Sequence, residues 1–177
     1  MGSGESWPYD WFYDNQIINE TPTIWENFRL IPGTAGIVTG GNPTILGKNL
    51  LKELDVHSLK KWPGYQAHHI IPKELSNHPI LKKMGIDLDD SSNGIFLRIP
   101  GNNVSVRSRH RGYHSVYSKF VKQKLDSMNA NDSITLLQFE VRTLQLKLRE
   151  LQSIGLPMYE SGGATIELWN RYFEKLQ

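Results

Sequence analysis

The chain has 177 residues, 38% of them hydrophobic and 21% charged, with a net charge of +2 and no cysteine. This composition fits a folded globular protein and excludes a disordered chain, and no apolar run reaches the roughly 18 residues of a membrane span. Without cysteine, neither a disulfide framework nor a thiolate metal site can form. A transition-metal site would have to use histidine, carboxylate or amide ligands.

The N-terminal 43 residues differ in composition from the rest of the chain. Residues 1–32 contain seven aromatic and five acidic residues but a single base, Arg29, and are too aromatic for a disordered tail. We expect them to pack on the main body or on a partner. Residues 32–43 are rich in glycine and proline and are interpreted as a linker. The polar and aromatic residues 1–10 do not resemble a signal peptide.

Hydrophobic spacing predicts the elements that follow. Leucines one turn apart predict a short helix over residues 45–54. Residues 65–71 and 94–99 are short apolar runs, each followed by a proline, and are predicted to form strands. A helical turn over residues 80–84 and a cluster of Asp and Ser over residues 87–92 are expected between them.

Three helices are predicted beyond the second strand, after a loop over residues 101–112. Apolar residues recur at helical spacing over residues 113–128, 134–154 and 164–176. Strand, loop, strand, loop and helix over residues 65–128 form a compact ββα unit. The predicted fold class is therefore α+β, with a ββα core surrounded by helices.

Positive charge is concentrated in one part of the chain. Between Ser91 and Leu125 there is no Asp or Glu, and the segment carries seven bases, namely Arg98, Arg107, Arg109, Arg111, Lys119, Lys122 and Lys124. The remaining residues together carry −5, the difference between +2 and +7. A basic segment in an otherwise acidic chain is typical of a site for a polyanion such as a nucleic acid. The alternative is a solvated helix face from which acids are absent by chance.

Four of the six histidines fall within the ββα unit. His68 and His69 are adjacent on the first strand, and His110 and His114 are four residues apart at the start of the helix. The second spacing places both imidazoles on one helical face if the first turn forms, and such pairs commonly bind one metal ion. The ordinary alternatives are structural roles for the first pair and solvent exposure for the second.

Three separated blocks of the sequence, residues 64–74, 85–97 and 110–117, resemble one known group of enzymes in the same order. They resemble the ββα-metal (His-Me finger, HNH-type) nucleases, and within them the branch named for an Ala-His-His (AHH) motif. That branch occurs as toxin modules of bacterial polymorphic toxin systems. The resemblance covers roughly residues 44–130 and implies a nuclease domain there, between the N-terminal residues 1–43 and a helical extension over 131–177.

The resemblance implies roles for five residues. His69 would be the general base that deprotonates the attacking water, a task for which a neutral imidazole is suited. His68, His110 and His114 would hold one divalent metal ion (Mg, Mn, Zn or Ni), with a phosphate contact as the alternative role of His110. Asn93 would orient His69 through a hydrogen bond. Adjacent strand residues point to opposite faces, so both histidines can serve one phosphate only if the strand twists or ends there.

The remaining polar residues near the motif have weaker assignments. Arg98, Arg107, Arg109 and Arg111 are expected to bind phosphates that flank the cleaved bond. For Asp87, Asp89 and Glu74 a role in the motif is open, because loop capping explains the aspartates as well as metal binding does. The two other histidines, His57 and His78, match no motif and are interpreted as surface residues.

The expected function is a metal-dependent endonuclease that hydrolyses DNA phosphodiester bonds. No DNA-recognition motif is visible, which favours cutting with little sequence specificity. The alternatives are an RNase, a mobile-element endonuclease, and a non-catalytic nucleic-acid-binding metal module. The resemblance implies an antibacterial effector exported without a recognisable signal peptide, which acts in the target-cell cytoplasm; otherwise the protein is expected to be cytoplasmic. It also implies a cognate immunity protein, with residues 1–43 docking to a carrier or chaperone and no membrane contact.

Overall fold

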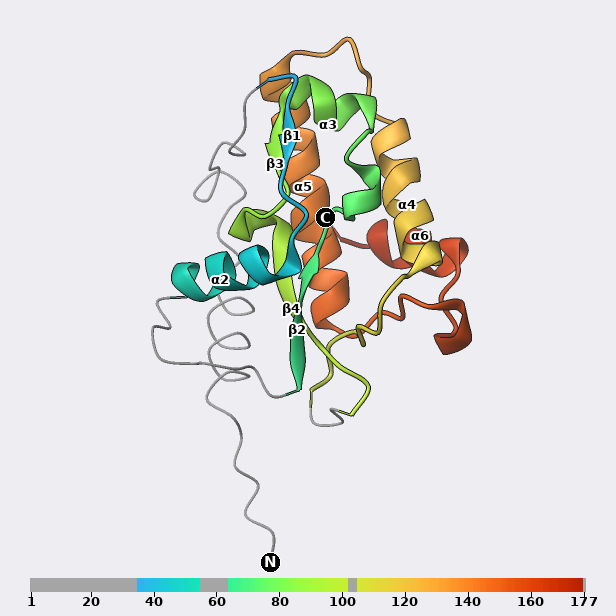
Figure 1. Ribbon diagram of the computed structural model, residues 1–177. Helices are drawn as coiled ribbons and strands as arrows, with labels where there is room; N and C mark the ends of the chain where they lie inside the picture. The colour runs from blue at the N-terminus through green and yellow to red at the C-terminus, as the bar shows by residue number, and fades with distance from the viewer. Residues whose placement is uncertain (1–34, 55–63, 102–104, 177) are drawn as a thin grey trace, which may run out of the picture.

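The computed structural model describes residues 35–54, 64–101 and 105–176 (Figure 1). Its strands and helices in chain order are β1 (Val38–Thr39), α2 (Pro43–Glu53), β2 (Tyr65–His69), α3 (Pro79–Met84), β3 (Ile86–Asp87), β4 (Gly94–Arg98), α4 (Ser115–Asp126), α5 (Ile134–Ser153) and α6 (Ile166–Phe173). Short 3₁₀ turns add η1 (Lys73–Leu75), η2 (Ser91–Asn93) and η3 (Glu160–Gly162). The aromatic segment 1–32 and His57 lie outside the described residues, so the expectations for them stay predictions.

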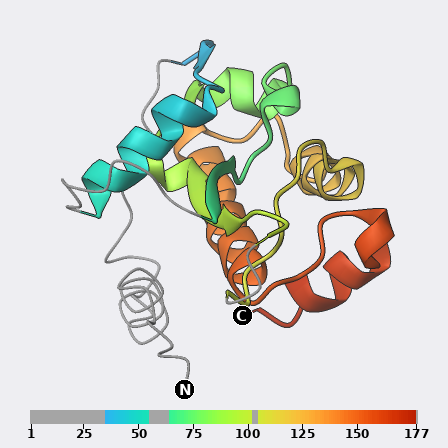
Figure 2. The same cartoon turned by 60° about the horizontal axis from the view of Figure 1, so that its bottom comes forward.

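Strands β2 and β4 pair antiparallel and confirm the two predicted strands. The register places His68 opposite Ile95 and His69 opposite Gly94. In Figures 1 and 2 the pair lies between α2 and the long helix α5. β2 ends at His69, two residues earlier than predicted. Beyond His69 the backbone no longer pairs with β4 in the strand register, because the Ile71 N–H donates to the side-chain oxygen Oδ1 of the buried Asn93 at 2.8 Å. Together with the surrounding helices this is the predicted α+β architecture.

The two faces of β2 meet different parts of the molecule. Ala67 packs with Leu46 and Leu50 of α2, and Gly94, opposite His69, lies so close to these leucines that a Cβ would fall 2.7 Å from Leu46 Cδ1. The other face, where His68 lies, turns toward α4 and the main core. The alternation expected of a strand is therefore kept, with His68 and His69 on opposite faces.

Residues 38–39 form a strand where a linker was predicted. β1 pairs in parallel with β3, with Val38 opposite Ile86 and Thr39 opposite Asp87. Leu88 N–H extends the pairing by donating to the Thr39 carbonyl at 2.9 Å. A two-residue strand carries no periodicity for the sequence to reveal.

The C-terminal helices form much of the main core. The predicted helix over residues 134–154 is confirmed as α5, and its apolar stripe is buried: Leu137, Val141, Leu144, Leu148 and Leu151. The predicted helix over 164–176 is the shorter α6, whose Trp169 packs against Phe120 and Tyr117 of α4. Among the described residues, no helix combines the length and the apolar character that crossing a membrane requires.

Candidate active site

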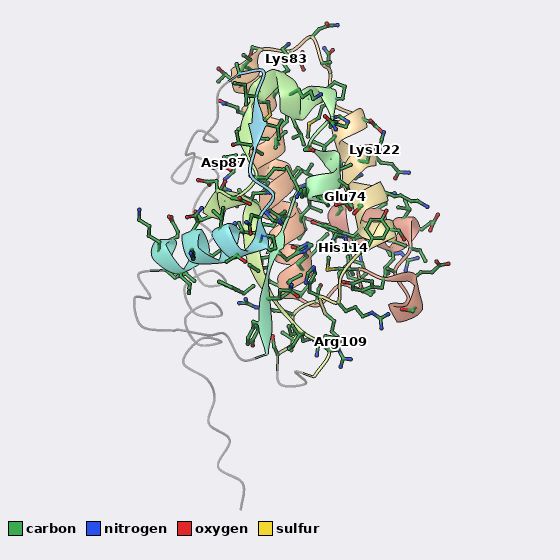
Figure 3. All side chains as sticks on the ribbon, in the orientation of Figure 1. Glu74, Lys83, Asp87, Arg109, His114 and Lys122 are labelled. Atoms are coloured by element: carbon green, nitrogen blue, oxygen red, sulfur yellow. The ribbon has the colours of Figure 1, made fainter. Side chains whose placement is uncertain are left out.

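Three histidines from two parts of the chain, His68 of β2 and His110 and His114 before α4, meet between β2 and the start of α4. The ring centroid of His68 lies 4.9 Å from that of His110 and 4.8 Å from that of His114, and the last two rings are 5.9 Å apart. One nitrogen of each ring lies within 4.8 Å of the others, so the group could hold a metal ion. We call these three residues the histidine cluster. In Figure 3, His114 lies between Glu74 and Arg109, where the chain enters α4.

The backbone brings the last two histidines together differently from the prediction. α4 begins at Ser115, and His114 is its N-cap, with φ −127° and ψ 76°. His110 lies on an extended stretch whose N–H donates to the Arg98 carbonyl at 2.8 Å. The predicted helical start at residue 113 is thus wrong, because the His110 N–H bonds to the end of β4 and the Tyr159 hydroxyl bonds to the backbone of Arg111 and Gly112. The two imidazoles converge through this loop and not through a shared helical face.

Polar neighbours fix the orientation of two rings of the cluster. His110 Nδ1 lies 3.0 Å from Gln66 Oε1, an acceptor, so Nδ1 carries the proton and Nε2 keeps its lone pair. His114 Nδ1 lies 3.2 Å from the hydroxyl of Ser118, which itself donates to a carboxylate oxygen of Glu74. This is the kind of outer contact that orients metal-ligating histidines.

The cluster fits a metal ion on two observations. His68 Nε2 is buried and has no hydrogen-bond partner among the described residues, although a buried polar atom ordinarily has one. Two nitrogens bound about 2.1 Å from a tetrahedral transition-metal ion lie about 3.4 Å apart. The ligand atoms of the cluster lie within 4.8 Å of one another, so small rotations of the three rings would bring them to one ion.

All three rings are held in the neutral form that binds metals. Burial lowers the pKa of His68 well below its ordinary value, and the neighbouring His114, His110 and His69 lower it further. Burial, with His114 and His69, lowers the pKa of His110 to about 4. Burial also lowers the pKa of His114, against smaller opposing contributions from a backbone hydrogen bond and Glu74. At neutral pH each ring has a lone pair to give to an ion.

His69, on the other face of β2, pairs with a carboxylate. Its Nε2 lies 2.9 Å from Asp89 Oδ1, and both side chains are almost fully buried. The sequence placed Asp89 near the motif but left its role open. A carboxylate 20 positions from its imidazole, in a turn, carries no spacing signal.

The structure contradicts the predicted contact between Asn93 and His69. Asn93 is fully buried, and its side chain binds instead to the backbone of Ile71 and Leu88 and to Gln145 Nε2 of α5, at 2.8–3.3 Å. It clamps the chain that leaves β2 against the turn that follows β3. Asn93 therefore holds the backbone that follows His69, and the side chain that contacts the His69 ring is that of Asp89.

The four arginines predicted to bind phosphates separate into two kinds. Arg107 is only 3% exposed and donates to the Phe96 carbonyl at 3.0 Å, so its assignment as a phosphate ligand is wrong. The guanidinium of Arg107 therefore binds to the backbone of β4, and the Arg107 carbonyl accepts a hydrogen bond from Arg98 Nε. Arg109 and Arg111 are exposed, with the guanidinium of Arg111 5.0 Å from the centre of the Tyr159 ring.

His78 is not the surface residue that the sequence suggested. It is 8% exposed and caps α3, with Nδ1 accepting from Ile80 N–H at 3.3 Å and Nε2 donating to Asp126 at 3.0 Å. Two partners of the cluster were missed although a signal existed. Gln66 is two residues from His68 on the same strand face, and Ser118 is four residues from His114 at helical spacing.

Comparison with known proteins points to one family. The family model described as "A nuclease family of the HNH/ENDO VII superfamily with conserved AHH" matches residues 49–154, more than half of the chain. The match spans the elements from α2 to α5 and includes every residue of the histidine cluster. No curated protein and no solved structure gave a match.

Proposed function

The chain belongs to this AHH nuclease family of the HNH/Endo VII superfamily, and we propose that it is a metal-dependent endonuclease that hydrolyses DNA phosphodiester bonds with little sequence specificity. The observation that carries the proposal is the histidine cluster beside a histidine paired with a carboxylate. One site then offers both a place for a cation and a base for water. A cation site next to a general base is suited to phosphodiester hydrolysis, the reaction expected of a nuclease of this superfamily.

In this proposal His68, His110 and His114 hold one divalent ion. When bound, the ion would stabilise the negative charge that grows on the phosphate and on the departing 3′ oxygen. Three imidazole nitrogens suit Zn²⁺ or Ni²⁺ in affinity, whereas Mg²⁺ or Mn²⁺ are alternatives as the catalytic ion. The outer contacts from Gln66 and from Ser118 with Glu74 would hold the rings of His110 and His114 in a fixed orientation when an ion binds.

His69 takes the proton of the attacking water. As the water oxygen bonds to phosphorus, the bond to the 3′ oxygen breaks, and that oxygen receives a proton from solvent. The side chain of His69 keeps 11% of its surface exposed, so a water molecule can reach it. Because β2 ends at His69, a phosphate that lies across this end of the strand can meet both faces of it.

Exposed bases would hold the phosphates on either side of the cleaved bond. Arg109 and Arg111 flank His110 in sequence and lie on the surface. Contacts of this kind position the substrate but carry no sequence information, which supports the proposed lack of specificity. An RNase or a mobile-element endonuclease with the same core, and a non-catalytic binding module, are the competing functions.

The biological setting is proposed from the family resemblance stated for the sequence. We infer an antibacterial effector, exported to act in the target cell and neutralised in its producer by a cognate immunity protein. Residues 1–43 would serve docking to a carrier or chaperone. The test of this setting is genetic and separate from the biochemistry. The toxin proposal predicts that expression of the chain stops bacterial growth and that His69→Ala relieves the arrest.

The biochemical test compares plasmid DNA with folded RNA as substrates for the full chain. Each is incubated with Mg²⁺, Mn²⁺, Zn²⁺ or Ni²⁺ and with EDTA, and products are followed on gels. We expect nicking and linearisation of the plasmid that EDTA abolishes. Cutting of RNA alone would replace DNA as the substrate, cutting undiminished by EDTA would overturn metal dependence, and binding of both without cutting would favour the non-catalytic module.

A further inference from the structure

One carboxylate oxygen of Asp89 is hydrogen-bonded both to His69, the predicted base, and to the backbone of residues 41–42. Asp89 Oδ1 accepts from His69 Nε2 at 2.9 Å and from the backbone N–H groups of Gly41 and Asn42, each at 2.8 Å. Asp89 is 3% exposed and lies between β3 and η2. The residues that meet there come from three separate segments, and the first of them, 41–42, precedes the family match over residues 49–154.

The donors around Asp89 determine the proton position on His69. The two backbone groups can only donate, and an ionised carboxylate can only accept. The contact to His69 Nε2 is therefore an N–H···O bond, in which Nε2 carries the proton. In a neutral imidazole the lone pair then resides on Nδ1, the nitrogen that does not face Asp89.

We propose that Asp89 is the positioning residue of His69, and that Gly40, Gly41 and Asn42 form a strap that holds Asp89 in place. Asp89 selects the tautomer with the proton on Nε2 and leaves the Nδ1 lone pair for the proton of water. An oriented carboxylate is known to fix a catalytic imidazole in this way in other hydrolases. The inference rests on the proposed role of His69 as base and adds the residues that prepare it.

The geometry of the strap explains its two adjacent glycines. Gly40 and Gly41 have φ of +83° and +97°, a region that side-chain-bearing residues rarely adopt. A Cβ on Gly40 would lie 2.6 Å from Asp87 Oδ1 and 2.7 Å from Asp89 N, and one on Gly41 would lie 2.8 Å from Lys73 Cδ. At Gly40 the backbone therefore lies closer to Asp87 and Asp89 than a residue with a side chain would allow, and at Gly41 it lies equally close to Lys73.

Further contacts hold the strap and the Asp89 turn together. Leu88 N–H donates to the Thr39 carbonyl, Asn49 Nδ2 donates to the Asp89 carbonyl at 2.8 Å, and Asp89 N–H donates to Asp87 Oδ1 at 3.0 Å. A displacement of residues 38–42 would remove two of the three donors from Asp89 Oδ1. The catalytic unit thus begins before the helix α2, within residues that the sequence suggested to be a linker.

A purely structural Asp89, which only caps the backbone of residues 41–42, predicts a different behaviour. Its loss would lower the stability of the fold but would leave the tautomer of His69 unchanged. The ¹⁵N chemical shifts of the imidazole distinguish the two cases, because protonated and unprotonated ring nitrogens resonate far apart. This readout does not depend on turnover.

The experiment records imidazole ¹⁵N spectra and steady-state plasmid cleavage for the full chain and two variants, Asp89→Ala and Asp89→Asn. We expect His69 of the parent to carry its proton on Nε2. Asp89→Ala should mix the tautomers and lower kcat by up to about 10⁴-fold with little change in KM, the loss that follows when a catalytic histidine takes the wrong tautomer. In Asp89→Asn the N–H groups of Gly41 and Asn42 should keep the amide oxygen at the position of Oδ1, where it accepts from His69, so this variant should restore most of the tautomer and part of kcat.

A matched glycine pair tests the strap even if Asp89→Ala does not fold. Gly40→Ala and Gly36→Ala both place a side chain at a φ near +85°, but nothing lies within 4 Å of a Cβ on Gly36. We expect only Gly40→Ala to disturb the His69 spectrum and to lower kcat. Equal effects of the two variants would overturn the strap, and a parent-like spectrum and kcat in Asp89→Ala would overturn the positioning role. If the parent cuts no nucleic acid but its His69 tautomer depends on Asp89, the proposed function fails and the positioning contact stands.

Discussion

The two faces of β2 use neighbouring histidines in opposite ways. On the face toward α4, His68 lies among two other imidazoles, and its buried Nε2 has no hydrogen-bond partner in the part of the chain that the structure describes. On the face toward α2, His69 is bonded to a buried carboxylate. The first environment keeps the rings neutral and places one nitrogen of each within 4.8 Å of the others, which suits a cation. The second fixes one proton on one ring, which suits a base. A single strand thus separates two chemistries by the alternation of its side chains.

The largest expected effect comes from removing the base and leaving the cluster intact. His69→Ala should lower the rate of plasmid cleavage by about 10²–10⁴-fold, the usual contribution of a positioned general base. Zn²⁺ binding by calorimetry should remain as in the parent, because no cluster nitrogen changes. Near-parental cutting by this variant would show that the two faces do not divide the chemistry as described.

The complementary change removes the cluster and leaves the base. His68→Ala or His114→Ala should abolish high-affinity binding of Zn²⁺ or Ni²⁺ and lose activity that excess metal partly restores. His78→Gln is the matched control, because this histidine lies outside the cluster and binds Asp126. Titration calorimetry with metal-free protein gives the affinities. If Zn²⁺ binds both cluster variants as tightly as it binds the parent, the ion resides elsewhere.

The sequence predicted those parts of the site that depend on residues close together in the chain. Strands β2 and β4 were found because short apolar runs ended by proline are local features, and the histidine cluster was found because its members stand in a recognisable order. The opposite faces of His68 and His69 follow from the period of a strand alone.

What the sequence did not predict depends on contacts between distant segments. β1 is too short to have a period, and the bond between Asp89 and His69 forms only when the turn after β3 folds onto β2. Charge patterning placed Arg107 among the phosphate ligands, because a count of bases contains no information on burial. The start of α4 was misplaced since the bond from His110 to the Arg98 carbonyl joins residues of two separate elements.

Acid should destabilise the metal-free protein through the cluster. The folded-state pKa values of His68, His110 and His114 lie below those of the unfolded chain, so below pH of about 6.5 the unfolded state binds more protons. Their effect on stability is absent above that pH, and the free energy of unfolding falls as pH decreases toward about 4, the pKa of His110.

Urea unfolding in EDTA at pH 7.5, 6 and 5 measures this loss. His110→Gln removes one of the three titrating histidines and should make the fall of the unfolding free energy with decreasing pH shallower. That result would assign the acid sensitivity to the histidine cluster on the His68 face of β2. A variant with the same pH dependence as the parent would exclude His110 as a source of the acid sensitivity. Added Zn²⁺ should raise the unfolding midpoint at pH 7.5 more than at pH 5, because protons compete with the ion for the rings.

The smallest effect concerns the substrate, which has to reach both faces from the end of the strand. With His69→Ala as an inactive background, Arg109→Ala should weaken binding to all DNA sequences about equally and reduce the slope of log K against log salt by about 1.

Arg107→Ala should instead lower the unfolding midpoint, because it removes a buried bond to the Phe96 carbonyl and leaves that oxygen without the charged donor. Lys175→Ala, which removes an exposed base just beyond the end of α6, is the control for charge alone. Fluorescence anisotropy at several salt concentrations separates the three, since only a base that contacts phosphate changes the slope. A slope changed as much by Lys175→Ala as by Arg109→Ala would mean that the phosphates follow another surface, and the end of β2 would then not be where the strand's two faces share a substrate.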